Sequence, residues 1–373
     1  MATVLGNLEG VRRALADSPM DAVVAVSPEN VPYLAGSIIE TQKGLRERLA
    51  VVLWPKGGEP SFLVCTIEEP QAREESWIQD IRGYVEFETS PAVLLGQVIR
   101  DRGLGRARIG IELGYLSAHY FAELQREAPQ ATFVPAEPFF TSVRAIKTPE
   151  EIEALKEAGI ATERALLATY ATIRVGETER SMRGRLFHNM LLCGADSFDF
   201  VYINAGGNSG FPHKIAGSYA CRTGDTVKSD VGGYWSGYVS DIGRTGVVGP
   251  PTPRQADIWA KLRDVQLATI DMLRPGNTPA MVFSMMKRSM EKANLPFPLP
   301  HAGHSIGRTV HEHPVLNPTD ESEIRPNMTF MVESRVRWPK KEGYHFEDLI
   351  LVTNGGPQWL TGAAFDNKEL FGI

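Results

Sequence analysis

The chain has 373 residues, of which 43% are hydrophobic and 23% are charged, and its formal net charge is −6. This length favours two domains, and the negative charge argues against nucleic acid or an anionic membrane as the main partner. No run approaches the ~20 apolar residues that a membrane span needs. The three cysteines have no CxxC spacing, which fits a reducing compartment. We therefore expect a cytoplasmic protein of two domains.

The N-terminal third alternates between helix and strand patterns. Helical periodicity covers residues 7–18 and 117–129, where Ser117 is a candidate N-cap. Strand patterns lie at 21–28 and 107–114, and residues 49–65 read as a hairpin with its turn at 56–60. This alternation predicts an α/β N-terminal domain, which we place at residues 1–140.

A second domain is predicted over residues 141–373, and it opens with a long helix. Thr148 is suited to cap this helix, Pro149 suits its first position, and Glu150 and Glu151 suit the positive end of its dipole. Further helical patterns and hairpin-like strands follow, without an apparent internal repeat. Helices grouped apart from antiparallel hairpins predict an α+β fold. The further helical patterns cover residues 178–194 and 252–273, and the strand patterns cover 200–206, 226–232, 238–248, 328–338 and 344–353.

The stretch "SDVGGYWSGYVSDIGRT", residues 229–245, reads as a hairpin that holds two acids. Folded about Trp235 and Ser236, it sets Asp230 directly opposite Asp241. Opposed residues on neighbouring strands have Cβ atoms roughly 5 Å apart, where like charges destabilise the pairing. Such a pair therefore needs a compensating charge.

A second hairpin repeats this arrangement. Folding "MTFMVESRVRW" and "YHFEDLILV" about Lys340 brings Glu333 near Glu347. Buried carboxylates cannot all stay ionised without a partner. Two divalent cations about 3.5 to 4 Å apart suit four bridging acids, so the two hairpins together predict a dinuclear metal site.

Histidines supply a further candidate ligand. The segment "HAGHSIGRTVHEHP" contains His301, His304, His311 and His313. Imidazole suits Mn, Fe, Co, Ni and Zn, whereas carboxylate oxygens favour harder ions. Four acids with one histidine favour two ions of Mn, Co or Fe ahead of Zn.

These motifs together resemble the creatinase/prolidase/methionine aminopeptidase family, peptidase family M24, whose catalytic domain has the pita-bread fold. "SDVGGYWSGYVSDIGRT", "GHSIGRTVHEHP", "FMVESRV" and "FEDLILVT" follow the order of the family motifs. The resemblance implies a creatinase-like N-terminal domain, a pita-bread catalytic domain and a homodimer. It implies the metal ligands Asp230, Asp241, His304, Glu333 and Glu347.

The resemblance also implies a reaction and further site residues. Water activated by the metals attacks a scissile carbonyl, Glu333 carries the proton, and His213 in "GFPHK" and His311 act on the substrate. Prolidase-like members read "E-P-G-I-Y" and then "R-x-E-D", whose arginine binds the substrate carboxylate. Here "VESRVRW" and "YHFED" place Ser334 at the proline and His345 at that arginine. Candidate substrate-binding residues are therefore His213, His311, Arg308, Arg335 and His345, with Arg337 nearby, and Arg46 or Arg48 in the N-terminal domain.

Several functions remain open at this point. The first is an Xaa-Pro dipeptidase or aminopeptidase, the second a creatinase- or ectoine-hydrolase-like hydrolase of a small non-peptide amide or amidine, and the third a non-catalytic binding protein. "GHSIG" also fits the G-x-S-x-G nucleophile elbow with Ser305 as nucleophile. That elbow must follow a buried strand and open a helix, whereas here a proline-rich segment precedes it.

Overall fold

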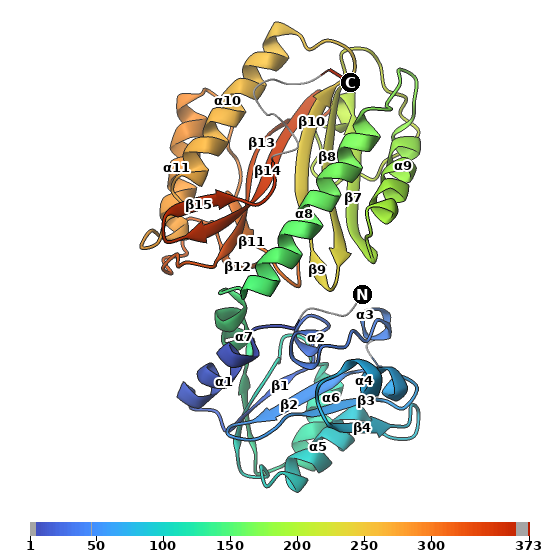
Figure 1. The fold of residues 1–373 in the computed structure, drawn as a ribbon, viewed down its shortest axis with the longest axis vertical. Coiled ribbons are helices and arrows are strands. Elements are labelled where there is room, and N and C mark those ends of the chain that lie inside the picture. The colour runs from blue at the N-terminus through green and yellow to red at the C-terminus, as the bar shows by residue number, and fades with distance from the viewer. Residues whose placement is uncertain (1–4, 46, 363–371) are drawn as a thin grey trace. The chain divides into compact units, whose positions relative to one another are not determined.

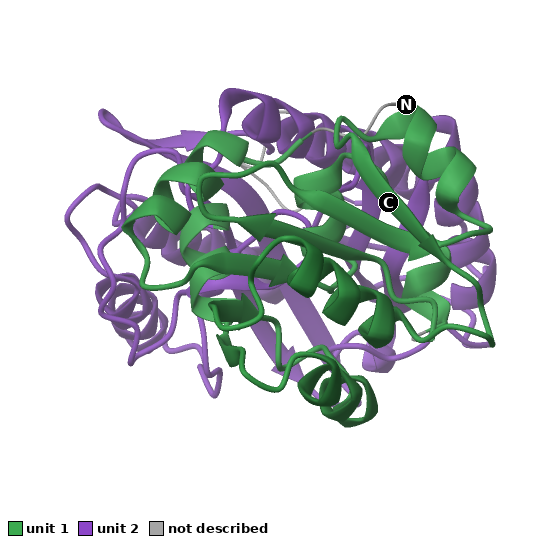
Figure 2. Cartoon of the chain, turned by 90° about the horizontal axis from the view of Figure 1, so that it is seen from below, with its two compact units in different colours: residues 1–144 green, residues 145–373 purple. Residues whose placement is uncertain are grey.

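A computed structural model describes residues 5–45, 47–362 and 372–373 of the chain. The chain divides into two compact units, residues 1–144 and residues 145–373, coloured separately in Figure 2. Arg46, one of the candidate substrate contacts, lies outside the described residues. Within the described ranges, no helix combines the length and apolarity that crossing a bilayer requires.

The first unit is built on one mixed sheet with strand order β4-β3-β2-β1-β5-β6 (Figure 1). Its strands are β1 (Ala22–Ala25), β2 (Val51–Pro55), β3 (Ser61–Cys65), β4 (Asp80–Tyr84), β5 (Arg108–Ile111) and β6 (Thr132–Pro135). Its helices are α1 (Leu8–Asp17), α2 (Asn30–Ala35), α3 (Thr41–Gly44), α4 (Glu69–Glu75), α5 (Pro91–Asp101), α6 (Ala118–Glu127) and α7 (Glu137–Arg144).

Both faces of this sheet are covered, which is why its strands are apolar at nearly every position. On β1, Val23 packs into the core formed with α1 and α7, whereas Val24 packs into the core formed with α5 and α6. Successive strand residues point to opposite faces, so a strand with helices on both sides needs apolar residues throughout. The antiparallel β2–β3 hairpin and the Ser117 cap of α6 confirm the sequence predictions for this α/β unit.

The second unit contains two sheets, each with its own pair of helices (Figure 1). The first half comprises α8 (Pro149–Tyr170), α9 (Glu179–Leu192), β7 (Ser197–Ala205), the short 3-10 helix η1 (Gly206–Asn208), β8 (Thr226–Trp235), β9 (Tyr238–Val239) and β10 (Ile242–Val247). The second half comprises α10 (Pro253–Ile270), α11 (Pro279–Lys292), β11 (Gly303–Ser305), β12 (Glu312–Val315), β13 (Thr329–Trp338), β14 (Glu342–Thr353) and β15 (Gly356–Trp359).

The two halves begin alike, a repeat that the sequence analysis missed. Thr148 and Thr252 each cap a long helix with Pro at the first turn, and each completes a capping box with the residue three positions later, Glu151 or Gln255. In both halves a second threonine-capped helix and antiparallel strands follow. A few residues that cap the helices and fill the core are enough to give both halves the same architecture. The other positions can differ between the halves, so the repeat is seen mainly in the structure.

The first acidic hairpin has a different register from the predicted one. Asp230 pairs with Gly243, two residues beyond Asp241, because the loop consists of Ser236 and Gly237 instead of Trp235 and Ser236. Both loop residues have positive φ, 51° and 81°, as a type I′ turn requires, and glycine suits such a position. A two-residue shift preserves the face of the strand, so the two aspartates are diagonal neighbours instead of directly opposed.

The second acidic hairpin has the predicted register. Glu333 on β13 pairs directly with Glu347 on β14, and the loop between the strands centres on Lys340, which has a φ of 63°. The acids of the two hairpins are brought together by contact between β10 and β14. Thr245 on β10 fixes this contact, because its hydroxyl accepts a hydrogen bond from the backbone N–H of His345 (2.8 Å) and donates one to the His345 carbonyl (3.1 Å).

Candidate metal centre

A pocket of about 220 Å³ opens in the second unit, over the strands that carry the acidic hairpins. Carboxylates and imidazoles dominate its lining, which also includes two aromatic rings. The lining residues are Phe200, Tyr202, His213, Asp230, Asp241, His304, Val310, His311, Glu333 and Glu347. All five residues expected to bind metal are among them.

The five expected ligands come from separate segments of the chain and converge in one buried cluster. The side chains of Asp230 (β8), Asp241 (before β10), His304 (β11), Glu333 (β13) and Glu347 (β14) are all buried. His304 Nε2 lies 3.5 Å from Asp241 Oδ2, 3.8 Å from Glu333 Oε1 and 4.0 Å from Glu347 Oε1. Two subsets have the compactness of a cation site: Asp241 with His304 and Glu347, and Asp230 with His345 and Glu347.

The electrostatics of the cluster call for added positive charge. Burial, together with the neighbouring carboxylates Glu347 and Asp230, raises the pKa of Asp241 well above its usual range. Burial and Asp230 raise the pKa of Glu347 to about 8. Asp241 Oδ1, Glu333 Oε1 and Glu347 Oε2 are buried and lack hydrogen-bond partners among the described residues. Such atoms are costly to bury unless something binds them, and oxygen-rich donors with imidazole suit divalent transition ions. The residues therefore fit the metal centre that the sequence predicts.

The histidines of the pocket are held mainly in their neutral form. Burial lowers the pKa of His304 well below its usual range, with a further contribution from His311, whose ring centroid is 4.0 Å away. Burial likewise lowers the pKa values of His213 and His311. Neutral imidazole can ligate a cation or donate one N–H. His213 is exposed over 63% of its side chain, and its Nε2 lies 3.9 Å from Asp230 Oδ2.

Arg335 lies among the acids, as expected for a residue near the site. It is buried, its guanidinium forms an ion pair with Glu333, and its Nη2 lies 3.2 Å from Nε2 of His301. Burial and the neighbouring Arg337 lower the pKa of Arg335 to about 10. Every second position of β13 from 333 to 337 is charged: Glu333, Arg335 and Arg337. Their side chains therefore project from the same face of the strand.

Arg308 lies outside the pocket lining, and Arg48 belongs to the first unit. The Arg308 guanidinium packs over the ring of Tyr238, 4.5 Å from its centroid, and Arg308 does not line the pocket. Arg48, in the first unit, forms a bidentate ion pair with Glu86. His313 is exposed, as a surface residue would be.

Ser305 does not have the setting of a nucleophile. It ends β11, a three-residue strand, and irregular chain follows it where an elbow would open a helix. Its side chain is fully buried and is not part of the pocket lining. The strand-turn-helix geometry that exposes the serine of an α/β-hydrolase is therefore missing here.

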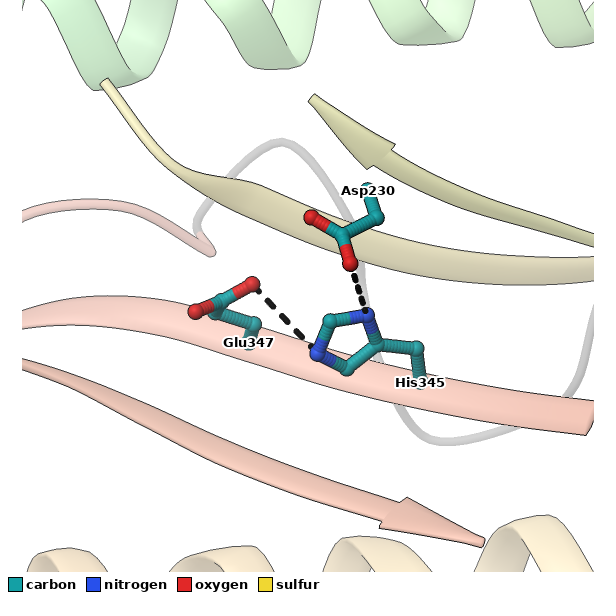
Figure 3. A group of neighbouring side chains, drawn as sticks. All are labelled: Asp230, His345 and Glu347. Carbon is teal, nitrogen blue, oxygen red and sulfur yellow. Dashed lines mark ion pairs between the residues drawn. The ribbon is translucent and has the colours of Figure 1, made fainter. Parts of the chain in front are cut away.

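His345 lies deeper in the acidic cluster than a substrate contact would. Its side chain is 1% exposed and is not part of the pocket lining. Figure 3 shows its ring between Asp230 and Glu347. Nδ1 is 3.7 Å from Asp230 Oδ2, and Nε2 is 3.4 Å from Glu347 Oε2 and 3.6 Å from Glu333 Oε2.

Lys228 is a site residue that the sequence analysis missed. It is fully buried on β8, and its ammonium donates hydrogen bonds to the carbonyls of Phe211 (3.1 Å) and Pro212 (2.6 Å). These bonds tie the segment before His213 to the strand that carries Asp230. Burial lowers the pKa of Lys228 to about 8. Its position two residues before Asp230 places it on the same strand face, a signal that was available in the sequence.

Comparisons with known proteins cover both units. Residues 153–354 match the family model described as Metallopeptidase family M24, and residues 7–146 match the Creatinase/Prolidase N-terminal domain. The fold class expected from the sequence, a creatinase-like α/β domain followed by a pita-bread catalytic domain, is thereby confirmed.

Individual relatives align along nearly their whole length. The chain is 28% identical over 367 residues to an Xaa-Pro dipeptidase of Lactobacillus helveticus, covering 97% of this chain and 98% of that protein. It is 30% identical to an Xaa-Pro dipeptidase of Pyrococcus horikoshii, with 92% and 93% covered. A solved dipeptidase structure from Pyrococcus horikoshii OT3 superimposes with a TM-score of 0.86 at 26% identity, with 98% and 99% covered.

Proposed function

Because this chain belongs to metallopeptidase family M24, we propose that it is a dinuclear-metal hydrolase of C–N bonds that cleaves Xaa-Pro dipeptides. The observation that carries the proposal is the convergence of Asp230, Asp241, His304, Glu333 and Glu347 on one pocket. The names of the full-length relatives support the substrate class. A pocket of about 220 Å³ suits a small substrate such as a dipeptide.

The five converging side chains would hold two divalent ions. When bound, the ions would neutralise the acids, polarise the scissile carbonyl and lower the pKa of a water molecule. Mn, Co or Fe is favoured over Zn because most of the donors are carboxylate oxygens.

The other steps belong to residues of the chain. Glu333 would accept the proton of the attacking water and deliver it towards the leaving nitrogen. His213 and His311 line the pocket, and as neutral imidazoles they can donate an N–H to the carbonyl oxygen as negative charge develops there. Arg335 is not itself among the residues that line the pocket, but it pairs with Glu333, which is. From there it would bind the carboxylate of the substrate, for which a guanidinium is well suited.

A second candidate function keeps the metals and the hydrolytic chemistry but changes the substrate. Ser334 and His345 stand where the prolidase-like pattern has proline and arginine, and Arg335 occupies the glycine position of that pattern. These differences lie on β13 and β14 beside the acids. They favour a small non-peptide amide or amidine, of the creatinase or ectoine-hydrolase kind, as the alternative substrate.

One assay separates these functions. Protein stripped of metal and refilled with Mn or Co is tested on Ala-Pro, Gly-Pro, creatine and ectoine. We expect turnover of the proline dipeptides that depends on added metal. Turnover of a non-peptide compound with none of the dipeptides would transfer the protein to the second candidate. Turnover that persists at full rate without metal would refute both.

A further inference from the structure

We propose that His345 is itself a metal ligand, which binds one ion together with Asp230 and Glu347, while His304 binds the other together with Asp241 and Glu347. Each of the two ions would then have one imidazole. The inference rests on the proposed dinuclear site and adds a ligand to it. Figure 3 shows the three side chains, which come from β8 and β14 and point towards one another.

The surroundings of the imidazole leave its nitrogens without hydrogen bonds. Neither Nδ1 nor Nε2 of His345 has a hydrogen-bond partner among the described residues, although the side chain is only 1% exposed. The carboxylate oxygens around it are 3.4 to 3.7 Å away, beyond the ~2.7–3.2 Å of an N–H···O bond. A buried imidazole with two unpaired nitrogens costs free energy, and its position needs another explanation.

A shared metal ion explains the position of the imidazole, because separations of this size suit two ligands of one metal. A nitrogen and an oxygen that each lie about 2.1 Å from an ion are at most ~4.2 Å apart. From Nε2, the oxygens of Glu347 and Glu333 at 3.4 and 3.6 Å fall within that limit. The 3.7 Å separation from Asp230 belongs to the other nitrogen, Nδ1, but one nitrogen of His345 and one oxygen each of Asp230 and Glu347 still lie within 4.8 Å of one another. His304, the histidine expected to bind metal, has closely similar separations of 3.5 to 4.0 Å from its neighbouring carboxylates. Nε2 of His345, with carboxylate oxygens at 3.4 and 3.6 Å, thus resembles Nε2 of His304 in its relation to the acids.

The fold also fixes the imidazole in this place. Thr245 pins the backbone of His345 from β10. A Cβ at Gly243 would lie 2.7 Å from His345 Nδ1, so the ring occupies space that only glycine leaves free. Gly243 is the cross-strand partner of Asp230. The position that brings the ring beside Asp230 is therefore built by residues of two strands.

The cation that the prolidase-like pattern carries at this position has a counterpart on the facing strand. Arg335 pairs directly with His345 across β13 and β14. A cation therefore remains beside the acids while position 345 carries a nitrogen donor. The imidazole of His345 makes its site softer than a carboxylate-only site, which shifts the preference among Mn, Co and Fe away from Mn.

The decisive measurement uses the wild-type chain. Crystals are grown with Co²⁺, and the ions are located by anomalous scattering at the cobalt edge. We expect two ions, with a ring nitrogen of His345 about 2.0–2.1 Å from one of them. Two ions that both lie more than ~3 Å from His345 would overturn the inference and leave the dinuclear function intact. No bound ion at saturating Co²⁺ or Mn²⁺ would overturn both.

Binding stoichiometry provides the second test. Co²⁺ is titrated calorimetrically, in competition with a chelator, into wild type, His345→Ala, His304→Ala and His188→Ala, the last an exposed histidine of α9. Loss of a tuning residue outside the ligand set typically weakens metal affinity about 10- to 100-fold, so loss of a ligand should exceed about 100-fold. We expect such a loss for one ion in His345→Ala and for the other in His304→Ala, with His188→Ala like wild type. Two-ion binding of wild-type affinity in His345→Ala would refute the ligand role.

Discussion

The guanidinium of Arg244 donates a hydrogen bond to the main-chain carbonyl of Glu347, with 2.5 Å between Nη1 and the oxygen. Its Nη2 also pairs with the carboxylates of Glu163 on α8 and Asp348 on β14, each at 2.5 Å. All of these groups are buried. Arg244 therefore links the first helix of the catalytic unit to the strand that presents Glu347 to the pocket.

Replacing Arg244 by methionine should destabilise the protein strongly. Methionine has an apolar side chain of moderate length and no charge. It leaves Glu163 and Asp348 buried without their cation, which typically lowers the free energy of unfolding by about 3–5 kcal/mol. The measurement is urea unfolding of the metal-free chain. Arg254→Met is the matched control, because Arg254 is exposed and pairs with Glu342 at the surface, where a pair contributes about 1 kcal/mol or less. Equal effects of the two variants would contradict this role for Arg244.

Asp241→Asn should abolish most of the activity while preserving the fold. The change removes one negative charge from an overcharged buried cluster, so the metal-free protein should be at least as stable as wild type. Metal affinity should fall because an amide is a poorer ligand than a carboxylate, and kcat/KM should drop at least about 100-fold. Steady-state hydrolysis of Ala-Pro and thermal unfolding with and without metal measure the two effects. Full activity in this variant would remove Asp241 from the proposed ligand set.

Stability of the metal-free protein should fall as pH rises from about 6.5 to 8. Glu347 has a folded-state pKa of about 8, above its unfolded value, so the folded state holds a proton that the unfolded state has lost, and this stabilisation disappears as pH approaches 8. The buried histidines have lowered pKa values and stabilise the fold increasingly up to about pH 6.5, so they add no slope above it.

The slope expected from Glu347 is about 1.4 kcal/mol per pH unit near pH 6.5 and about half of that at pH 8, where the lowered pKa of Lys228 begins to oppose it. Chemical unfolding at half-unit pH intervals measures it, with EDTA present. Saturating Mn²⁺ should reverse the trend, because metal binding favours the deprotonated carboxylates. Metal-free stability that stays level or rises between pH 6.5 and 8 would contradict the raised pKa of Glu347.

Arg335→Met should weaken recognition of a substrate carboxylate. A hydrogen bond to a charged group contributes about 1.5–3 kcal/mol, so KM for Ala-Pro should rise about 10- to 100-fold. Ala-Pro amide, which lacks the carboxylate, should be affected much less, and the preference for acid over amide should shrink. Arg308→Met is the control, since Arg308 lies over Tyr238 and the preference should persist there. An unchanged preference in Arg335→Met would assign carboxylate binding to another residue, such as Arg337.

Much of the site could be predicted from the sequence because its chemistry depends on local pattern. A hairpin about Lys340 was predicted to place Glu333 opposite Glu347, and the structure confirms it. The alternation of side chains between the two faces of a strand and a short turn together fix this register. The register at Asp230 was wrong by two residues. The loop consists of Ser236 and Gly237 because these two residues have positive φ. The sequence alone also allows a loop of Trp235 and Ser236.

Tertiary structure alone decided the rest. By itself, the sequence determined many of the helices and strands, the caps at Thr148 and Ser117, and the residue types expected to bind metal, because these depend on neighbours within a few positions. The roles of Arg244 and Thr245 depend on contacts between segments far apart in the chain, which no local pattern encodes. The place of His345 beside Asp230 likewise requires two sheets to meet at Gly243. Only the packing of these sheets brings the imidazole of one strand beside the carboxylate of another.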